Sequence, residues 1–358
     1  MTNPTGFHVR RSTATTRAGF GVFALAALAL ATVPFTASGS TETTLTELLF
    51  YLGLAQMWNL VAGYAGLLSI GQQAWVGLAA YAIYFTAEKH DLPLIVAVAL
   101  SAVVVTVLSY PAGLVAFRLR GGYFAVGTWV IAEIFRLGTL RIDALGAGDI
   151  QSFTVGRAFS GLGVASRHHL MYWAALVLGI GGTLILLGVL RSRIGLALMA
   201  SADEEGAAGS LGVEVRRLRM VVWLVAAFWT ALIGAFVHLN AGTVTNANAF
   251  SVLDWTAIVI FIVVVGGVGS ISGPIIGTAI FWTITQLLEN QTTWRFIILG
   301  LLAVVVAATD PRGVVGLISR RRRFEPFPVE RIVTAVGTVP NEPVTNEPVP
   351  NQPVPNQP

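Results

Sequence analysis

Few side chains in this sequence could do chemistry inside an apolar environment. Glu133 lies in the middle of an apolar stretch, with Arg136 one helical turn later. A carboxylate at the centre of a helix in lipid costs about 3 kcal/mol, so Glu133 should face protein or water and pair with Arg136. Its role is open between structural positioning and solute contact. An ion-coupled secondary transporter would need several such carboxylates, so that class is disfavoured.

The remaining reactive residue types do not indicate an enzyme. His168 and His169 are adjacent without a third ligand, His238 stands alone near the end of an apolar stretch, and there is no cysteine. We therefore expect no catalysis, no metal and no cofactor. Lys89 is the only lysine, and no P-loop surrounds it, so a separate subunit must bind any ATP that the protein uses.

The elements that carry these residues belong in a lipid bilayer. The chain has 358 residues, of which 55% are hydrophobic, and a mean hydropathy of +0.74. This is more apolar surface than one soluble core can bury, and it predicts an all-α, polytopic helical membrane protein. The net charge of +4 comes from short loops and a tail, so we interpret it as topology information and expect no nucleic-acid partner.

The loop charges predict a multi-pass protein of the cell membrane with both termini in the cytoplasm. Residues 1–18 form a basic N-terminal arm, 19–318 a transmembrane domain, and 319–358 a disordered Pro-rich tail. The first apolar run resembles a signal peptide, but the many later segments favour a retained span. We expect about ten crossings, or eight with two re-entrant segments. The expected segments are 19–35, 48–61, a third ending at 87, 94–117, 123–137, 170–190, 220–239, 255–267, 275–288 and 296–309.

Two glycine-rich stretches interrupt this pattern and place polar groups at membrane depth. One is GYAGLLSIGQ from Gly63, and the other is GGVGSISGP from Gly266. Close helix packing through small residues and a broken helix lining a solute path explain them about equally well. The candidate path residues are Gly63, Gly66, Ser69, Gly71, Gln72, Glu133, Gly266, Gly267, Gly269 and Ser270.

A charged island at residues 191–219 separates two apolar segments and must lie in water. Ser201 and Glu204 form an S-x-x-E capping box, and Gly212 offers a helix stop, which predicts a short helix from Ala202 to Leu211. A solvated connecting helix is the simpler interpretation. The alternative is a docking element, because acidic residues in the first turn precede a patch of small side chains. The candidate residues are Ser201, Asp203, Glu204, Glu205, Ala207, Ala208 and Gly212.

Four stretches together resemble the permease subunits of branched-chain amino-acid ABC importers, of the LivM-like type. They are GYAGLLSIGQQAWVGLAAY (63–81), LRGGYFAVGTWVIAEIFRL (119–137), DEEGAAGSLGVEV (203–215) and VVVGGVGSISGPIIG (263–277). Each motif alone is weak, but four in this order and spacing are specific. The resemblance covers roughly residues 45–318.

The resemblance implies a passive translocation pathway for branched-chain or related amino acids. It implies four partners besides the solute: a second, homologous permease, two cytoplasmic ABC ATPases and an extracytoplasmic solute-binding protein. The island then resembles the family's coupling loop, whose E-x-A-A-x-x-x-G core falls on Glu205, Ala207, Ala208 and Gly212. The sequence departs from the family pattern in two places. Where the family carries arginines around the coupling helix, this chain has Leu196, Met199 and Ala202. The segment LGAGDIQ at 145–151 only partly fits the family's T-G-G-x-x-G turn. The alternative solutes are urea, short amides or another small polar molecule.

Overall fold

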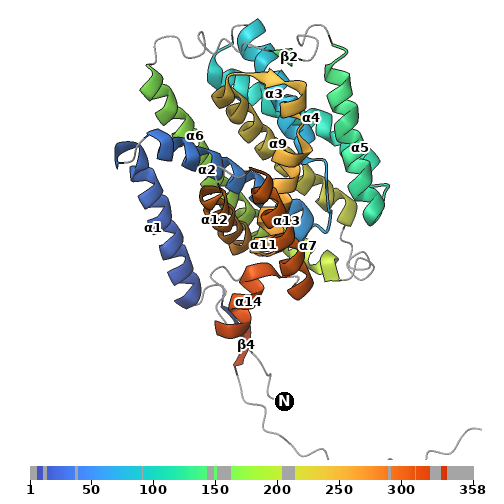
Figure 1. Ribbon diagram of the computed structural model, residues 1–358. Coiled ribbons are helices and arrows are strands. Elements are labelled where there is room, and N and C mark those ends of the chain that lie inside the picture. The colour runs from blue at the N-terminus through green and yellow to red at the C-terminus, as the bar shows by residue number, and fades with distance from the viewer. Residues whose placement is uncertain are drawn as a thin grey trace, which may run out of the picture.

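The computed structural model describes residues 6–10, 14–36, 39–90, 92–142, 149–150, 163–203, 214–288, 292–310, 312–322 and 332–336. Most of these residues are helical, as predicted, and the described chain also contains two short pairs of antiparallel strands (Figure 1). The α-helices are α1 (Ala14–Thr36), α2 (Gly39–Asn59), α3 (Gln72–Ile83), α4 (Leu94–Ala116), α5 (Gly122–Thr139), α6 (Val164–Arg191), α7 (Arg193–Asp203), α9 (Val215–Ala241), α10 (Asn246–Ala249), α11 (Ile258–Gly266), α12 (Ser272–Leu287), α13 (Thr292–Thr309) and α14 (Gly313–Arg322). The π-helical turns are η1 (Leu60–Tyr64), η2 (Tyr84–Lys89) and η4 (Leu253–Ala257), and the strands are β1 (Gly6–Arg10), β2 (Asp149–Ile150), β3 (Val244–Thr245) and β4 (Ile332–Val336).

Among the described residues, five helical stretches are long and apolar enough to cross a membrane, and Trp294–Thr309 is a shorter apolar helix. Large apolar side chains on the outside of the bundle fit such a setting. Ile95 on α4 is 83% exposed and Val304 on α13 is 66% exposed. Lipid tails solvate these groups without the free-energy cost that water imposes. The five stretches are Gly19–Thr36, Leu94–Ala116, Ser166–Arg191, Val215–Ala241 and Asn246–Gly266.

Small residues let the central helices approach closely. Helix α2 packs along α6, and α9 packs against both α3 and α4 (Figure 1). A Cβ at Gly179 of α6 would lie 2.6 Å from the Leu49 carbonyl oxygen of α2. Glycine is therefore required for this backbone contact, as at helix crossings in membranes generally. This packing fixes α2, which carries most of the polar groups discussed below.

Both predicted glycine-rich interruptions are confirmed. After η1 the chain leaves helical structure and re-enters it at Gln72, and after Gly266 it does so again at Ser272. Three glycines adopt positive φ in these breaks: Gly66 (69°), Gly267 (134°) and Gly269 (74°). A side chain is strained in that region, which explains why glycine occupies these positions.

Two expectations about the chain ends need correction. Helix α1 begins at Ala14, so the first span extends into the predicted arm. Residues 319–358 are not disordered throughout, because α14 continues to Arg322 and β4 pairs antiparallel with β1, with Gly6 opposite Val336 and Arg10 opposite Ile332. The β-strand propensity of the segment Ile332–Val336 outweighed the Pro-rich composition that follows it. The Pro-rich repeats themselves lie outside the described residues.

The island holds a described helix that begins earlier than the predicted one. Helix α7 runs from Arg193 to Asp203, so the backbone of Ser201 already lies inside a helix, and most of the predicted helix Ala202–Leu211 lies outside the described residues. Ser192 caps α7 instead, since its Oγ accepts a hydrogen bond from the Ile194 N–H at 3.1 Å. Leu198 is fully buried and packs α7 against the bundle. Glu204, Glu205, Ala207, Ala208 and Gly212 lie outside the described residues.

Candidate translocation site

The two glycine-rich interruptions, far apart in sequence, cross each other in space, and Asn59 joins them. Its Nδ2 donates to the Ser270 carbonyl at 2.9 Å, and its Oδ1 accepts from the Gly269 N–H at 2.9 Å. Gly63 completes the contact, because a Cβ there would lie 2.6 Å from the Gly269 nitrogen. One fully buried side chain therefore satisfies two backbone groups that the broken helix leaves free.

Gln56 adds a second bridge one turn before Asn59. Its Nε2 donates to the Ile271 carbonyl and to Thr183 Oγ1, both at 3.2 Å. Gln56 Oε1 is buried and accepts no hydrogen bond from the described residues. The crossing thus contains an acceptor that a polar solute or water could satisfy.

The other half of the first interruption is also held by specific bonds. Trp58 Nε1 donates to the Ser69 carbonyl at 2.8 Å, and Gln72 Nε2 donates to the Leu54 carbonyl at 3.1 Å. Gln73 and Thr256 bond to each other through both backbone and side chain, which ties α3 to η4. Ser69 and Gln72 are almost fully buried, so they belong to the same polar interior as Asn59.

Several candidate path glycines are packing positions. A Cβ at Gly71 would overlap the Thr128 carbonyl oxygen of α5, and one at Gly266 would overlap the Gly273 carbonyl oxygen. Gly267 meets the Arg312 backbone in the same way. Gly66 differs, because nothing lies near its missing Cβ. The structure therefore favours the packing explanation for Gly71, Gly266 and Gly267.

Glu133 lies outside the crossing of the two interruptions and belongs to a separate ion-pair network. Arg136 Nε donates to both Glu133 carboxylate oxygens at 2.9 Å, which confirms the predicted ion pair. Arg136 Nη1 donates to Asn246 Oδ1 at 2.9 Å, and Asn246 Nδ2 donates to the Arg136 carbonyl and to Thr139 Oγ1. This network fastens α5 to α10 and places Glu133 in a structural tether.

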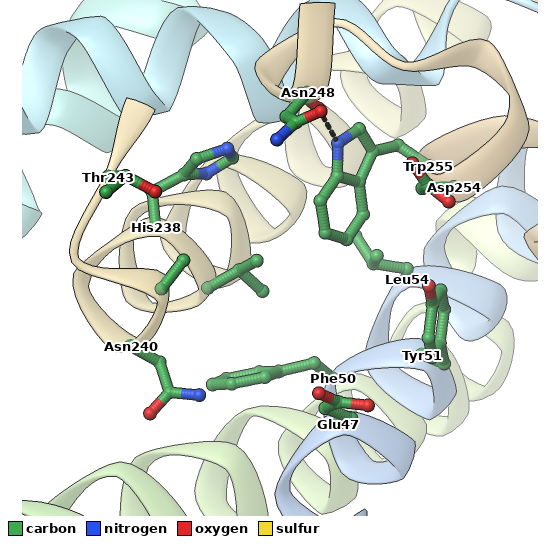
Figure 2. A pocket seen from close by; sticks show the side chains of 12 residues that line it. Glu47, Phe50, Tyr51, Leu54, His238, Asn240, Thr243, Asn248, Asp254 and Trp255 are labelled. Atoms are coloured by element: carbon green, nitrogen blue, oxygen red, sulfur yellow. Dashed lines mark hydrogen bonds between the residues drawn. The ribbon is translucent and has the colours of Figure 1, made fainter. Parts of the chain in front are cut away.

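A pocket of about 380 Å³ opens between the middle turns of α2 and the segment that joins α9 to η4 (Figure 2). Helix α2 contributes Glu47, Phe50, Tyr51 and Leu54, and the end of α9 contributes His238. Figure 2 shows the Trp255 indole fixed over the pocket by its bond from Nε1 to the Asn248 carbonyl, at 2.7 Å. The remaining lining residues are Val237, Asn240, Ala241, Thr243 and Asp254.

Two carboxyl side chains, Glu47 and Asp254, lie on the pocket wall, and Glu47 is partly desolvated. Burial raises the pKa of the Glu47 carboxyl, and the positive charge of Arg295 partly offsets this rise. Glu47 comes from α2 and Asp254 from η4, and both line this one pocket. None of the residues that line the pocket in the described structure is a lysine or an arginine.

The comparison with protein families decides the class. Residues 40–307 match the family model for the permease component of the branched-chain amino acid transport system. The chain belongs to this family. It is therefore the permease component of an ABC transporter and catalyses no reaction itself, and the match includes both glycine-rich interruptions and the island.

Two kinds of curated relative resemble this permease. The high-affinity branched-chain amino acid transport permease LivM of Escherichia coli is 26% identical over 82% of this chain and 74% of its own length. LivM of Salmonella typhimurium is 25% identical over the same shares. The galactose/methyl galactoside import permease MglC of Haemophilus influenzae is 26% identical over 62% of this chain and 68% of its own. No solved structure matches the permease significantly.

Sequence reasoning missed the residues that organise both sites of the permease. Gln56 and Asn59 lie three residues apart in an apolar segment, and this spacing puts two amides on one helix face at membrane depth. That signal was available. Glu47, His238 and Asp254 carry no such signal, because each looks like an isolated residue near a helix end.

His169, one of the two adjacent histidines, also has a structural role. His169 Nδ1 lies 2.9 Å from Glu42 Oε1, which links the start of α6 to the start of α2. Within the described residues no group of three or more His, Asp or Glu side chains could hold a metal ion.

Proposed function

We propose that this permease imports branched-chain or related amino acids. The observation that supports this most is the extent of the match to LivM, which covers 82% of the chain, against 62% for the sugar permease MglC. The permease would pair with a second, homologous permease and with two cytoplasmic ATPases, and would receive solute from an extracytoplasmic binding protein. The basic residues near α7, the start of α9 and α14 would face the cytoplasm, together with both termini, after about ten crossings.

Uptake in reconstituted vesicles tests the proposed solute. Vesicles that hold the complete complex, with ATP at the nucleotide-binding face and the binding protein on the opposite face, should accumulate leucine. They should not accumulate galactose or urea at the same concentration, because neither carries the charged groups of an amino acid. Vesicles without ATP serve as the control. Accumulation of galactose or urea without leucine would overturn the proposal.

We further propose that the island couples the permease to its ATPases through Glu205. The Glu205→Arg variant should insert normally and pair with its sister permease, yet lose solute-stimulated ATP hydrolysis, because it reverses the acidic charge of the coupling motif. Glu214→Arg is the matched control, since Glu214 is 74% exposed and lies outside the E-x-A-A-x-x-x-G core at 205–212. Stimulation of Glu205→Arg equal to that of wild type would show that the island is only a connector.

A further inference from the structure

The pocket between α2, the end of α9 and η4 offers an unusual set of hydrogen-bond acceptors. Its lining includes two carboxylates, Glu47 and Asp254, and one imidazole, His238. Its volume of about 380 Å³ lies at the lower end of the range for small-molecule sites, which suits a small solute. The question is which chemical group these side chains would select.

His238 is a buried polar side chain with one nitrogen committed to the protein and one left for a ligand. It is 3% exposed, and its Nδ1 lies 2.9 Å from the Gly234 carbonyl oxygen. A carbonyl oxygen only accepts, so Nδ1 carries the proton, and in the neutral ring Nε2 is an acceptor. Nε2 makes no hydrogen bond within the described structure, and the ring lines the pocket (Figure 2).

Aromatic rings form the rest of the recognition surface. Tyr51 and Trp255 stack with centroids 6.3 Å apart and an interplanar angle of 29°, and Trp255 also lies 5.8 Å from His238. The faces of tyrosine and tryptophan attract cations. The bond from Trp255 Nε1 to Asn248 holds the indole in place before any solute arrives.

The chemistry excludes an anion and a metal ion as the preferred ligand. An anion would face two carboxylates, and Arg295, which attracts Glu47, is not part of the lining. Glu47, Asp254 and His238 line the pocket, but among the described residues no three such side chains are grouped so that they could hold a metal ion. An organic ammonium remains, because it can donate to several oxygen and nitrogen acceptors and lie against aromatic faces at once.

We propose that this pocket is a solute-binding site that selects a primary ammonium group, with Glu47 and Asp254 as counter-charges and His238 as a neutral acceptor. The inference rests on the proposed function and deepens it, because it assigns the recognition of an amino acid's α-ammonium to the permease itself. A sugar lacks this group and would leave the carboxylates without a counter-charge.

Thiol labelling of the complete complex tests the charge of the pocket. The chain is naturally free of cysteine, so Thr243→Cys at the pocket and Ser40→Cys at the start of α2 each give one reactive thiol in the permease. Cationic trimethylammonioethyl methanethiosulfonate should react faster than anionic sulfonatoethyl methanethiosulfonate at position 243. We expect this rate ratio to be about tenfold higher than at position 40, from two carboxylates acting through partly aqueous surroundings. In a Glu47→Gln, Asp254→Asn background the two ratios should become similar.

Protection experiments on Thr243→Cys test the ligand class. Leucine and leucinol, which both carry the ammonium, should slow labelling, while isocaproate, which keeps the carboxylate and lacks the ammonium, and galactose should not. The Glu47→Gln, Asp254→Asn background should lose this protection. Glu214→Gln in place of the double substitution is the control, and it should keep protection.

The outcomes separate this inference from the proposed function. Equal protection by isocaproate or galactose, protection that survives the double substitution, or no protection by any of the four solutes would overturn the ammonium site. Leucine uptake is measured in parallel with cysteine-free wild type. If uptake persists while the ammonium site fails, only the pocket assignment falls, and if wild type transports no leucine, the proposed function itself falls.

Discussion

The Asn59→Leu variant is expected to abolish uptake and to lower the yield of folded permease sharply. The substitution keeps the size of the side chain but removes both bonds that join the interruptions, to the Gly269 N–H and the Ser270 carbonyl. Each buried backbone group left without a partner costs about 1–3 kcal/mol, so the total is about 2–6 kcal/mol. That is a large share of the stability of a typical folded protein.

The measurement is the thermal unfolding midpoint of the purified complex, followed by uptake at a temperature where the protein stays folded. Gln286→Leu is the matched control, because Gln286 is an amide on α12 whose side chain is exposed. It should change stability by about 0.5 kcal/mol or less. If Asn59→Leu unfolds and transports like wild type, the bridge between the interruptions has no role in holding them together.

The Gly266→Ala variant should also be severely destabilised. Its new methyl group would overlap the Gly273 carbonyl oxygen, so α11 and α12 would have to move apart at this contact. Backbone atoms cannot rotate away as a flexible side chain can, so the strain spreads to Gly267 and to its contact with Arg312. We expect little folded protein in the membrane.

Gly300→Ala is the control in the same part of the chain. Nothing lies near its missing Cβ on α13, and alanine stabilises a helix interior by about 0.5–1 kcal/mol relative to glycine. Both variants replace glycine by alanine, so a difference between them reports the surroundings of each position. We expect the membrane level and the unfolding midpoint to fall for Gly266→Ala and to rise for Gly300→Ala. A normal level of Gly266→Ala would contradict the packing role that the structure assigns to this glycine.

The sequence predicts the interruptions well because glycine clusters in apolar segments are a local signal. The crossing of the two interruptions could not be predicted, since Asn59 and Ser270 are far apart in the chain and only tertiary packing brings them together. The failed capping box shows the reverse error. Ser201 and Glu204 have the right local spacing, but Ser201 lies inside α7, which packs against the bundle through the buried Leu198.

The pocket could not be predicted from the sequence for a similar reason. Glu47, His238 and Asp254 belong to three elements, and each has an ordinary explanation on its own. The ion pair of Glu133 and Arg136 was predictable because it lies within one helix turn. Its continuation to Asn246 was not, because that contact again joins distant segments.

The pairing of β1 with β4 constrains how the chain threads the bilayer. Hydrogen-bonded strands cannot have a membrane between them, so the chain ends that carry Gly6–Arg10 and Ile332–Val336 occupy the same compartment. The chain between these strands must then traverse the bilayer an even number of times. The described structure holds five stretches that are long and apolar enough to cross a membrane. If each of the five crosses once, an odd number of further passages comes from shorter pieces, for which the broken helices around the Asn59 bridge and the apolar helix Trp294–Thr309 are available.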